Sequence, residues 1–235
     1  MKTDAVVRQL FLAAICVFIA ALNKVHGQIE IYAGPSENRF SLFRDSASAT
    51  GYEFGGRYGV RSWLALDAGY TDFGKVNSAF SVVAVLPPGF TLVTTGILSG
   101  PLHVDARVDA RAVYLLPEFR CSFGSLLSGS LGVGLARFES KIGSNEFYEL
   151  PVPVGGSAPS PTWLPTYSGT RRSWTGIGRA SLRAVVSRSW TAEASVHFTS
   201  APAINADYAL GVDIGNRRLQ VLGGTVDLIW RFPAK

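Results

Sequence analysis

Beyond residue 27, apolar and polar residues alternate along much of the chain, which is the period of a β-strand with two different faces. The clearest stretch runs from Leu102 to Leu116. Its two parities are Val104, Ala106, Val108, Ala110, Ala112 and Tyr114 on one face, and His103, Asp105, Arg107, Asp109, Arg111 and Val113 on the other. An apolar face thus opposes a face of alternating charge over about ten residues, roughly the length that crosses a bilayer as a tilted strand.

The same alternation predicts seven further strands, around residues 29–33, 52–58, 64–70, 130–135, 179–184, 192–198 and 225–232. Short connections fall near 60–62, 117–128 and 186–189, and long ones cover 35–49, 76–101, 141–171 and 200–216. Short turns at one end and long loops at the other are typical of an outer-membrane barrel. We therefore predict an all-β fold, an eight-stranded antiparallel up-and-down transmembrane β-barrel.

Alternation alone does not show which face points inward, because a soluble barrel would place the apolar parity inside. Three features favour the membrane orientation. Aromatic residues at strand ends form a predicted membrane girdle: Trp63, Trp190, Trp230 and Phe232 at the short-turn end, and Trp174 at the other. The charges alternate in sign along a strand, which suits a closed interior where charges must pair. The final strand carries apolar or aromatic residues at every second position.

The membrane orientation directs the charged parities into the barrel. The predicted interior charge network consists of Glu53, Arg57, Asp67, Asp105, Arg107, Asp109, Arg111, Arg179, Arg183, Glu193 and Asp227. Eight strands enclose an interior that side chains can just fill. We therefore predict a paired structural plug, and a narrow gated ion path along the arginines is the alternative.

The first 27 residues have the layout of a secretory signal peptide. Lys2 and Arg8 precede a 13-residue uncharged apolar run, Leu10 to Leu22, and small or modest residues precede a cut before Gln28. Thirteen residues are too few to span a bilayer of about 30 Å comfortably, although an uncleaved anchor is the alternative. The predicted organisation is a signal peptide over 1–27 and a barrel over 28–235, located in the outer membrane of a Gram-negative bacterium.

Composition excludes several classes of protein. Hydrophobic residues make up 47% and charged residues 17%, which excludes disorder. Cleavage would remove three of 22 basic and one of 17 acidic residues, leaving a net charge of +3, too small to indicate a nucleic-acid partner. Only Cys121 would remain of two cysteines, so no internal disulfide is expected, and no His, Cys or carboxylate cluster has metal-ligand spacing. We expect neither a metal nor a cofactor.

His197 is the main candidate for enzyme chemistry, because some eight-stranded outer-membrane barrels are lipid A deacylases with a His and a Ser two positions apart. Here Thr199 stands at the matching position and Ser200 has the wrong parity. His197 shares its parity with Glu193, so an interior ion-paired histidine is the simpler interpretation. We expect a protein that is not an enzyme.

Four stretches resemble the small outer-membrane barrels related to outer-membrane protein A. Residues 51–58, GYEFGGRY, and 64–75, LALDAGYTDFGK, are similar to their second and third strands. Residues 190–194, WTAEA, resemble their seventh strand, and the terminal Trp230-Arg231-Phe232 is similar to the aromatic end that the barrel-assembly machinery recognises. The resemblance implies outer-membrane lipid and that machinery as partners. Residues 233–235 follow the aromatic that normally ends the chain, and no residues remain for a peptidoglycan-binding domain.

Two of the long connections suggest a role at the cell surface. The uncharged segment 76–101 favours a hairpin that extends two strands and turns at Pro87-Pro88-Gly89. The segment 141–171 combines five prolines with Tyr148, Trp163 and Tyr167, aromatics available to a ligand or receptor. We expect a structural or surface-interacting role, in envelope integrity, adhesion or recognition. A soluble periplasmic barrel that binds an apolar ligand and a lipid A-modifying enzyme are the alternatives.

Overall fold

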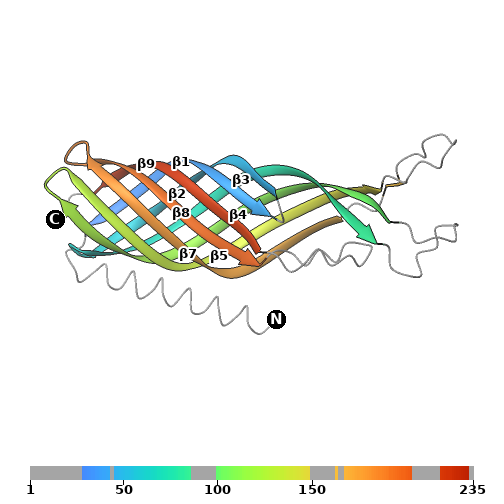
Figure 1. Ribbon diagram of the computed structural model, residues 1–235. Coiled ribbons are helices and arrows are strands. Elements are labelled where there is room, and N and C mark those ends of the chain that lie inside the picture. The colour runs from blue at the N-terminus through green and yellow to red at the C-terminus, as the bar shows by residue number, and fades with distance from the viewer. Residues whose placement is uncertain are drawn as a thin grey trace, which may run out of the picture.

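Each alternating segment of the sequence lies in a β-strand of the computed structural model (Figure 1). The structure describes residues 28–42, 45–85, 99–148, 162–163, 167–202 and 218–232. Its strands are β1 (Ile29–Leu42), β2 (Asp45–Arg61), β3 (Leu64–Val85), β4 (Ser99–Phe123), β5 (Leu127–Tyr148), β6 (Thr162–Trp163), β7 (Tyr167–Val185), β8 (Trp190–Pro202) and β9 (Arg218–Arg231). The described residues include no helix long and apolar enough to cross a membrane.

Eight of these strands close into a ring. Every neighbouring pair is antiparallel, in the order β1-β2-β3-β4-β5-β7-β8-β9, and β9 returns to β1. The closing ladder runs from Glu30 opposite Arg231 to Ser41 opposite Gln220. The short β6 pairs only with the end of β5. The predicted eight-stranded antiparallel barrel is confirmed.

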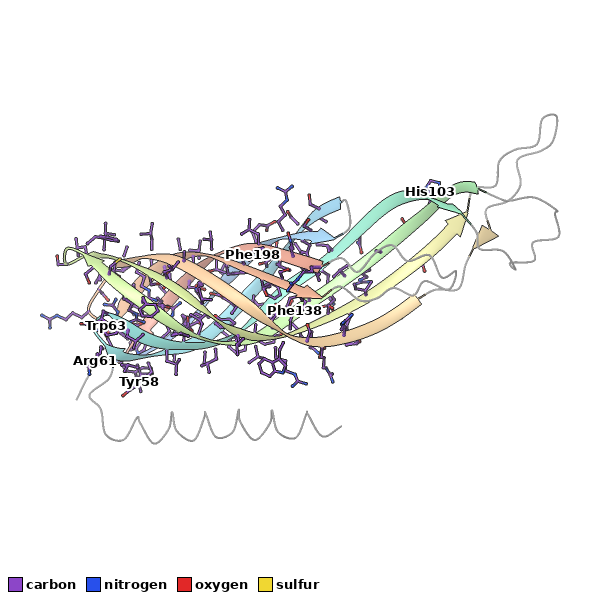
Figure 2. The ribbon with its side chains drawn as sticks, turned by 60° about the horizontal axis from the view of Figure 1, so that its bottom comes forward. Tyr58, Arg61, Trp63, His103, Phe138 and Phe198 are labelled. Atoms are coloured by element: carbon purple, nitrogen blue, oxygen red, sulfur yellow. The ribbon has the colours of Figure 1, made fainter. Side chains whose placement is uncertain are left out.

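The two ends of the barrel differ in length and in shape. At one end the ring is joined by tight turns, and Figure 2 shows Arg61 and Trp63 there, far from His103 at the other end. Toward the other end the β3–β4 ladder continues to Val85 and Ser99, whereas the β2–β3 ladder stops at Tyr52 and Asp72. The β5–β7 ladder likewise extends beyond the β7–β8 ladder. Strands β3, β4, β5 and β7 therefore project beyond the ring as an open sheet.

The strands occupy much of what the sequence predicts as long connections. The expected loop over 35–49 is wrong, because β1 and β2 continue through it except at 43–44, which lie outside the described residues. Alternation persists there in residues that are mainly small or polar, with Ser36, Asn38 and Phe40 inside the barrel. The hairpin expected over 76–101 is confirmed in its strands, which pair up to Val85, whereas its Pro-Pro-Gly turn lies outside the described residues.

The boundary between two kinds of barrel wall is a row of outward residues, Tyr70, Val113, Arg137 and Trp174, that are paired across β3, β4, β5 and β7. We name the part between this row and the short turns the turn half, and the part beyond it the loop half. In the turn half, the outward positions of β4 from Phe123 to Val113 carry no charge. Ten residues of a strand tilted by about 40° rise roughly 26 Å, close to the roughly 25 Å apolar band of an outer-membrane barrel.

Candidate functional site

Arg57 is the centre of a charge network that fills the turn half. Its Nε lies 2.8 Å from Asp67 Oδ2 and 3.1 Å from Glu118 Oε2. Its two Nη groups donate to the two carboxylate oxygens of Glu193 at 2.8 and 2.7 Å. This paired geometry is the strongest that an arginine and a carboxylate form. One buried guanidinium thus joins β2, β3, β4 and β8 across the interior.

A second arginine, Arg179 on β7, organises the next layer. Its Nη2 lies 2.6 Å from Glu53 Oε1, 2.9 Å from Glu193 Oε1 and 2.9 Å from Asp227 Oδ2. Its Nη1 donates to the Tyr114 hydroxyl at 2.9 Å. Glu193 is therefore shared by both central arginines, which makes the two layers one network.

The network reaches the turn end through three further arginines. Arg183 pairs with Glu118 and Glu193, and Arg120 donates to Glu30 Oε2 at 2.8 Å. Arg231 lies 3.5 Å from the other oxygen of Glu30. Across the described residues the network joins the arginines 57, 120, 179, 183 and 231 to the carboxylates 30, 53, 67, 118, 193 and 227. Buried charges that are nearly balanced in this way compensate one another.

Two tyrosines complete the packing of the network. Tyr32 donates to Asp67 Oδ1 at 2.7 Å and lies 2.6 Å from the Tyr114 hydroxyl. The guanidinium of Arg57 stacks 4.2 Å from the centre of the Tyr32 ring. Because an aromatic face stabilises a cation that has left water, the ring supports the centre of the network.

Predicted members of the network fall on both sides of the barrel wall. Glu53, Arg57, Asp67, Arg179, Arg183, Glu193 and Asp227 lie inside and are nearly inaccessible. The interior position expected for Asp105, Arg107, Asp109 and Arg111 is wrong, because these residues point outward and Ala106, Val108, Ala110 and Ala112 point inward. This stretch of β4 belongs to the loop half, where the outward side chains are charged and the inward ones are apolar.

The interior of the loop half is a separate environment. Its packed residues are mainly apolar, and the rings of Phe73 and Phe138 lie 5.7 Å apart. Among the described residues, the buried charged side chains belong to the network around Arg57 and Arg179, and none belongs to this apolar cluster. The apolar cluster covers the charge network from the loop side.

His197 lies between these two environments. Its Nε2 is 3.1 Å from Asn38 Oδ1, and its ring packs 5.5 Å from that of Phe73. The side chain is inside the barrel, as its parity predicts, but its partner is an amide and not Glu193. The geometry therefore directs this histidine away from the outer face, where a lipid substrate would approach. Among the described residues, no group of three His, Cys, Asp or Glu side chains could hold a metal ion.

The predicted girdle residues all lie on the outer wall, four of them at the turn end of the barrel and Trp174 within β7. Trp190 and Trp230 face each other across β8 and β9 with ring centres 4.6 Å apart, and Trp63 stacks on Phe119. Phe232 is exposed beside them. Trp174 lies at the opposite boundary with the guanidinium of Arg137 5.9 Å from its ring. The arrangement supplies an amphipathic ring at each edge of the apolar band.

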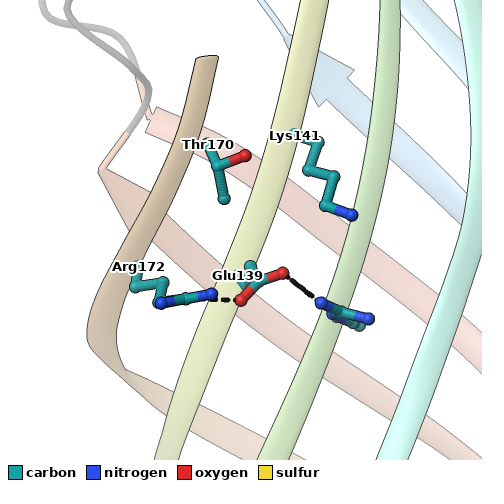
Figure 3. Close-up of a pocket in the computed structure, with 5 residues that line it drawn as sticks. Glu139, Lys141, Thr170 and Arg172 are labelled. Atoms are coloured by element: carbon teal, nitrogen blue, oxygen red, sulfur yellow. Dashed lines mark hydrogen bonds and ion pairs between the residues drawn. The ribbon is translucent and has the colours of Figure 1, made fainter.

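Directly beyond the Trp174 row, the outer wall holds an open hollow of about 370 Å³ that is lined by Arg111, Glu139, Lys141, Thr170 and Arg172 (Figure 3). Arg172 Nε donates to Glu139 Oε2 at 2.6 Å, and Arg111 Nε donates to Oε1 at 3.0 Å. These bonds hold the pKa of Glu139 below its ordinary value, with the bond from Arg172 as the largest cause. Three cations and one carboxylate leave the hollow with a net positive charge.

Sequence reasoning misses several functional residues. Glu30, Glu118 and Arg120 belong to the network, and Glu139 organises the hollow. The sequence of β4 does contain a signal for Glu118. Its odd-numbered positions are charged up to Arg111 and uncharged from Val113 onward. With Val113, Leu115 and Phe119 on the outer face, the alternation places Glu118 on the inner face.

No protein-family model matches the chain, and no curated protein matches it. Among solved structures, it is similar to Ail, the attachment invasion locus protein of Yersinia pestis, at 13% identity and a TM-score of 0.47, with 88% of this chain and 100% of that chain covered. It is also similar to Neisserial surface protein A, at 12% identity and a TM-score of 0.46, covering 88% and 98% of the two chains. The outer membrane protein OprG from Pseudomonas aeruginosa gives 12% identity and a TM-score of 0.46, covering 88% and 97%.

Proposed function

We propose that this chain is an integral outer-membrane protein that crosses the membrane as a closed barrel and acts at the cell surface through its loop half. The observation that carries the proposal is the inversion of the wall at the Tyr70–Trp174 row. Apolar side chains face outward and charges inward on the turn side, and the reverse holds on the loop side. Only a protein whose surroundings change from lipid to water along its axis is stabilised by both arrangements.

The proposal includes export by a signal peptide over residues 1–27, which lie outside the described residues. It also includes insertion by the barrel-assembly machinery through β9, whose outward residues Leu222, Val226 and Leu228 end at Trp230. The role at the surface is structural or interactive, in envelope integrity, adhesion or recognition. The chain is not proposed to be an enzyme, since His197 faces Asn38 inside the barrel.

Cell fractionation with detergent electrophoresis tests this proposal. We expect the protein to sediment with outer membrane and to migrate faster unboiled than boiled, because a closed barrel resists detergent. A protein recovered in the periplasm with no shift on boiling would contradict the proposal and favour the soluble ligand-binding barrel.

Planar bilayers test whether the barrel conducts ions. The paired network occupies the interior around Arg57 and Arg179, so we expect no stepwise conductance from the wild-type protein. Steps that disappear or change size in an Arg179→Gln variant would instead support the ion path. Arg107→Gln is the matched control, because Arg107 lies on the outer wall.

A further inference from the structure

The hollow of Figure 3 lies at a boundary that would be the outer membrane surface. On β5, Leu131, Val133 and Leu135 face outward in turn, then Arg137, then Glu139 and Lys141. Along this strand the outward residues are therefore apolar up to Leu135 and charged from Arg137 onward, and Trp174 of β7 lies opposite Arg137 at the change. A lipid has the same order along its length, from acyl chain to charged headgroup.

The strand register concentrates cations at this point. Arg111, Glu139 and Arg172 are directly opposite one another on β4, β5 and β7, and Lys141 follows Glu139 two positions later on the same face. The Arg111 and Arg172 side chains are 44% and 62% exposed, whereas that of Glu139 is 14% exposed. The carboxylate is thus covered by the two guanidiniums and holds them in place, while they remain accessible to a ligand.

We propose that this hollow binds the phosphate of an outer-leaflet glycolipid, with Arg111, Lys141 and Arg172 as the ligating side chains. Arg172 donates to Glu139 through Nε, and its side chain is mostly exposed to solvent. Guanidinium groups match phosphate oxygens in paired hydrogen bonds, and Lys141 adds a point charge. The acyl chains of the same lipid pack against Val113 and Leu135, which are exposed on the adjoining apolar wall.

A lipid is favoured over a soluble anion by the position of the hollow. The site adjoins the apolar band directly, with Trp174 and Arg137 in between. This inference rests on the proposed outer-membrane location, because a protein outside the membrane would not meet the lipid in this orientation. A soluble phosphate or sulfated sugar could reach the charges but would leave the apolar wall unused.

The experiment uses the full barrel in phosphatidylcholine nanodiscs that contain a small fraction of lipid A, a diphosphorylated glucosamine lipid. Native mass spectrometry counts the lipid A molecules retained after the disc is removed. We expect retention by the wild type and a loss on the order of tenfold in a Lys141→Gln/Arg172→Gln variant, which lacks two charged donors. Arg39→Gln is the matched control, because Arg39 is exposed on β1, across the ring from β5, and it should retain lipid A like the wild type.

Two further measurements distinguish binding of a lipid phosphate from binding of a soluble anion. Inorganic phosphate at millimolar concentration and lipid A without phosphates are each compared with intact lipid A. The proposal would be overturned if inorganic phosphate displaced lipid A at a concentration equal to that of the lipid. It would also be overturned if the barrel retained dephosphorylated lipid A as well as intact lipid A. Unchanged retention in the double variant would overturn it as well.

A gel shift on boiling is recorded for each preparation. If the barrel shifts and lipid A is not retained, the lipid site is wrong and the proposed function stands. If no preparation shifts on boiling, both proposals fail together.

Discussion

The turn half and the loop half are built from the same strands but place their charges on opposite sides of the wall. In the turn half Arg57 lies fully inside and Leu131 is 61% exposed outside. In the loop half Val108 and Ala110 are inside, and Arg111 is outside. The alternation along a strand defines two faces but does not determine which of them points into the barrel. Under the proposed membrane orientation, that depends on whether lipid or water surrounds the outer face. The two halves are therefore expected to differ in which substitutions lower the free energy of unfolding.

The largest expected effect comes from removing a charge at the centre of the turn half. Arg57→Met leaves Asp67, Glu118 and Glu193 without their main cation, which costs about 3–5 kcal/mol of the free energy of unfolding. Denaturant titration of the barrel in lipid vesicles measures it, and the fraction that shifts on boiling serves if folding fails. The matched change Arg111→Met in the loop half should cost about 0–1 kcal/mol, since its pair with Glu139 is exposed. Equal losses in the two variants would contradict the difference between the halves.

A charge placed on the outer wall should have the next largest effect. Leu131→Arg puts a guanidinium on the apolar band, which costs about 2–4 kcal/mol near the middle of a bilayer. Ser168→Arg puts the same side chain on the outer wall of the loop half, where water solvates it, and should leave the free energy of unfolding nearly unchanged. The same denaturant titration compares the two. If Leu131→Arg is harmless, the outer face of the turn half does not contact lipid.

The smallest expected effect is a dependence on pH at the hollow. The pKa of Glu139 is lowered because Arg172 and Arg111 donate hydrogen bonds to its carboxylate. A pKa lowered in the folded state means that the pair stabilises the fold above the ordinary carboxyl pKa of about 4.3, and that this contribution is lost as the pH falls through the folded value. Glu139→Gln should therefore cost up to about 1 kcal/mol at neutral pH and less at pH ~3.

Thermal or denaturant unfolding at both pH values measures the difference. A larger cost of Glu139→Gln at acid pH than at neutral pH would show that the carboxylate opposes folding.

The sequence predicts the strands well because alternation is a local property of each segment. It predicts the network members on β2, β3, β7, β8 and β9, because the turn-half segments of those strands keep charges on one parity and apolar or small residues on the other. It misplaces Asp105 to Arg111 because β4 keeps its period of two along its whole length while the charges change from the outer face to the inner face after Arg111. The hollow could not be predicted, because it depends on the register that brings Arg111, Glu139 and Arg172 together from three strands.

The sharing of Glu193 by Arg57 and Arg179 has a consequence for the order of assembly. The carboxylate lies 136 positions from one arginine and 14 from the other along the chain, so the two bonds are available at different stages of folding. Before β8 reaches its place, Arg57 would have to enter the bilayer without this partner. We expect insertion and ring closure to proceed together, because an incomplete barrel would leave unpaired charges in the bilayer, which cannot solvate them.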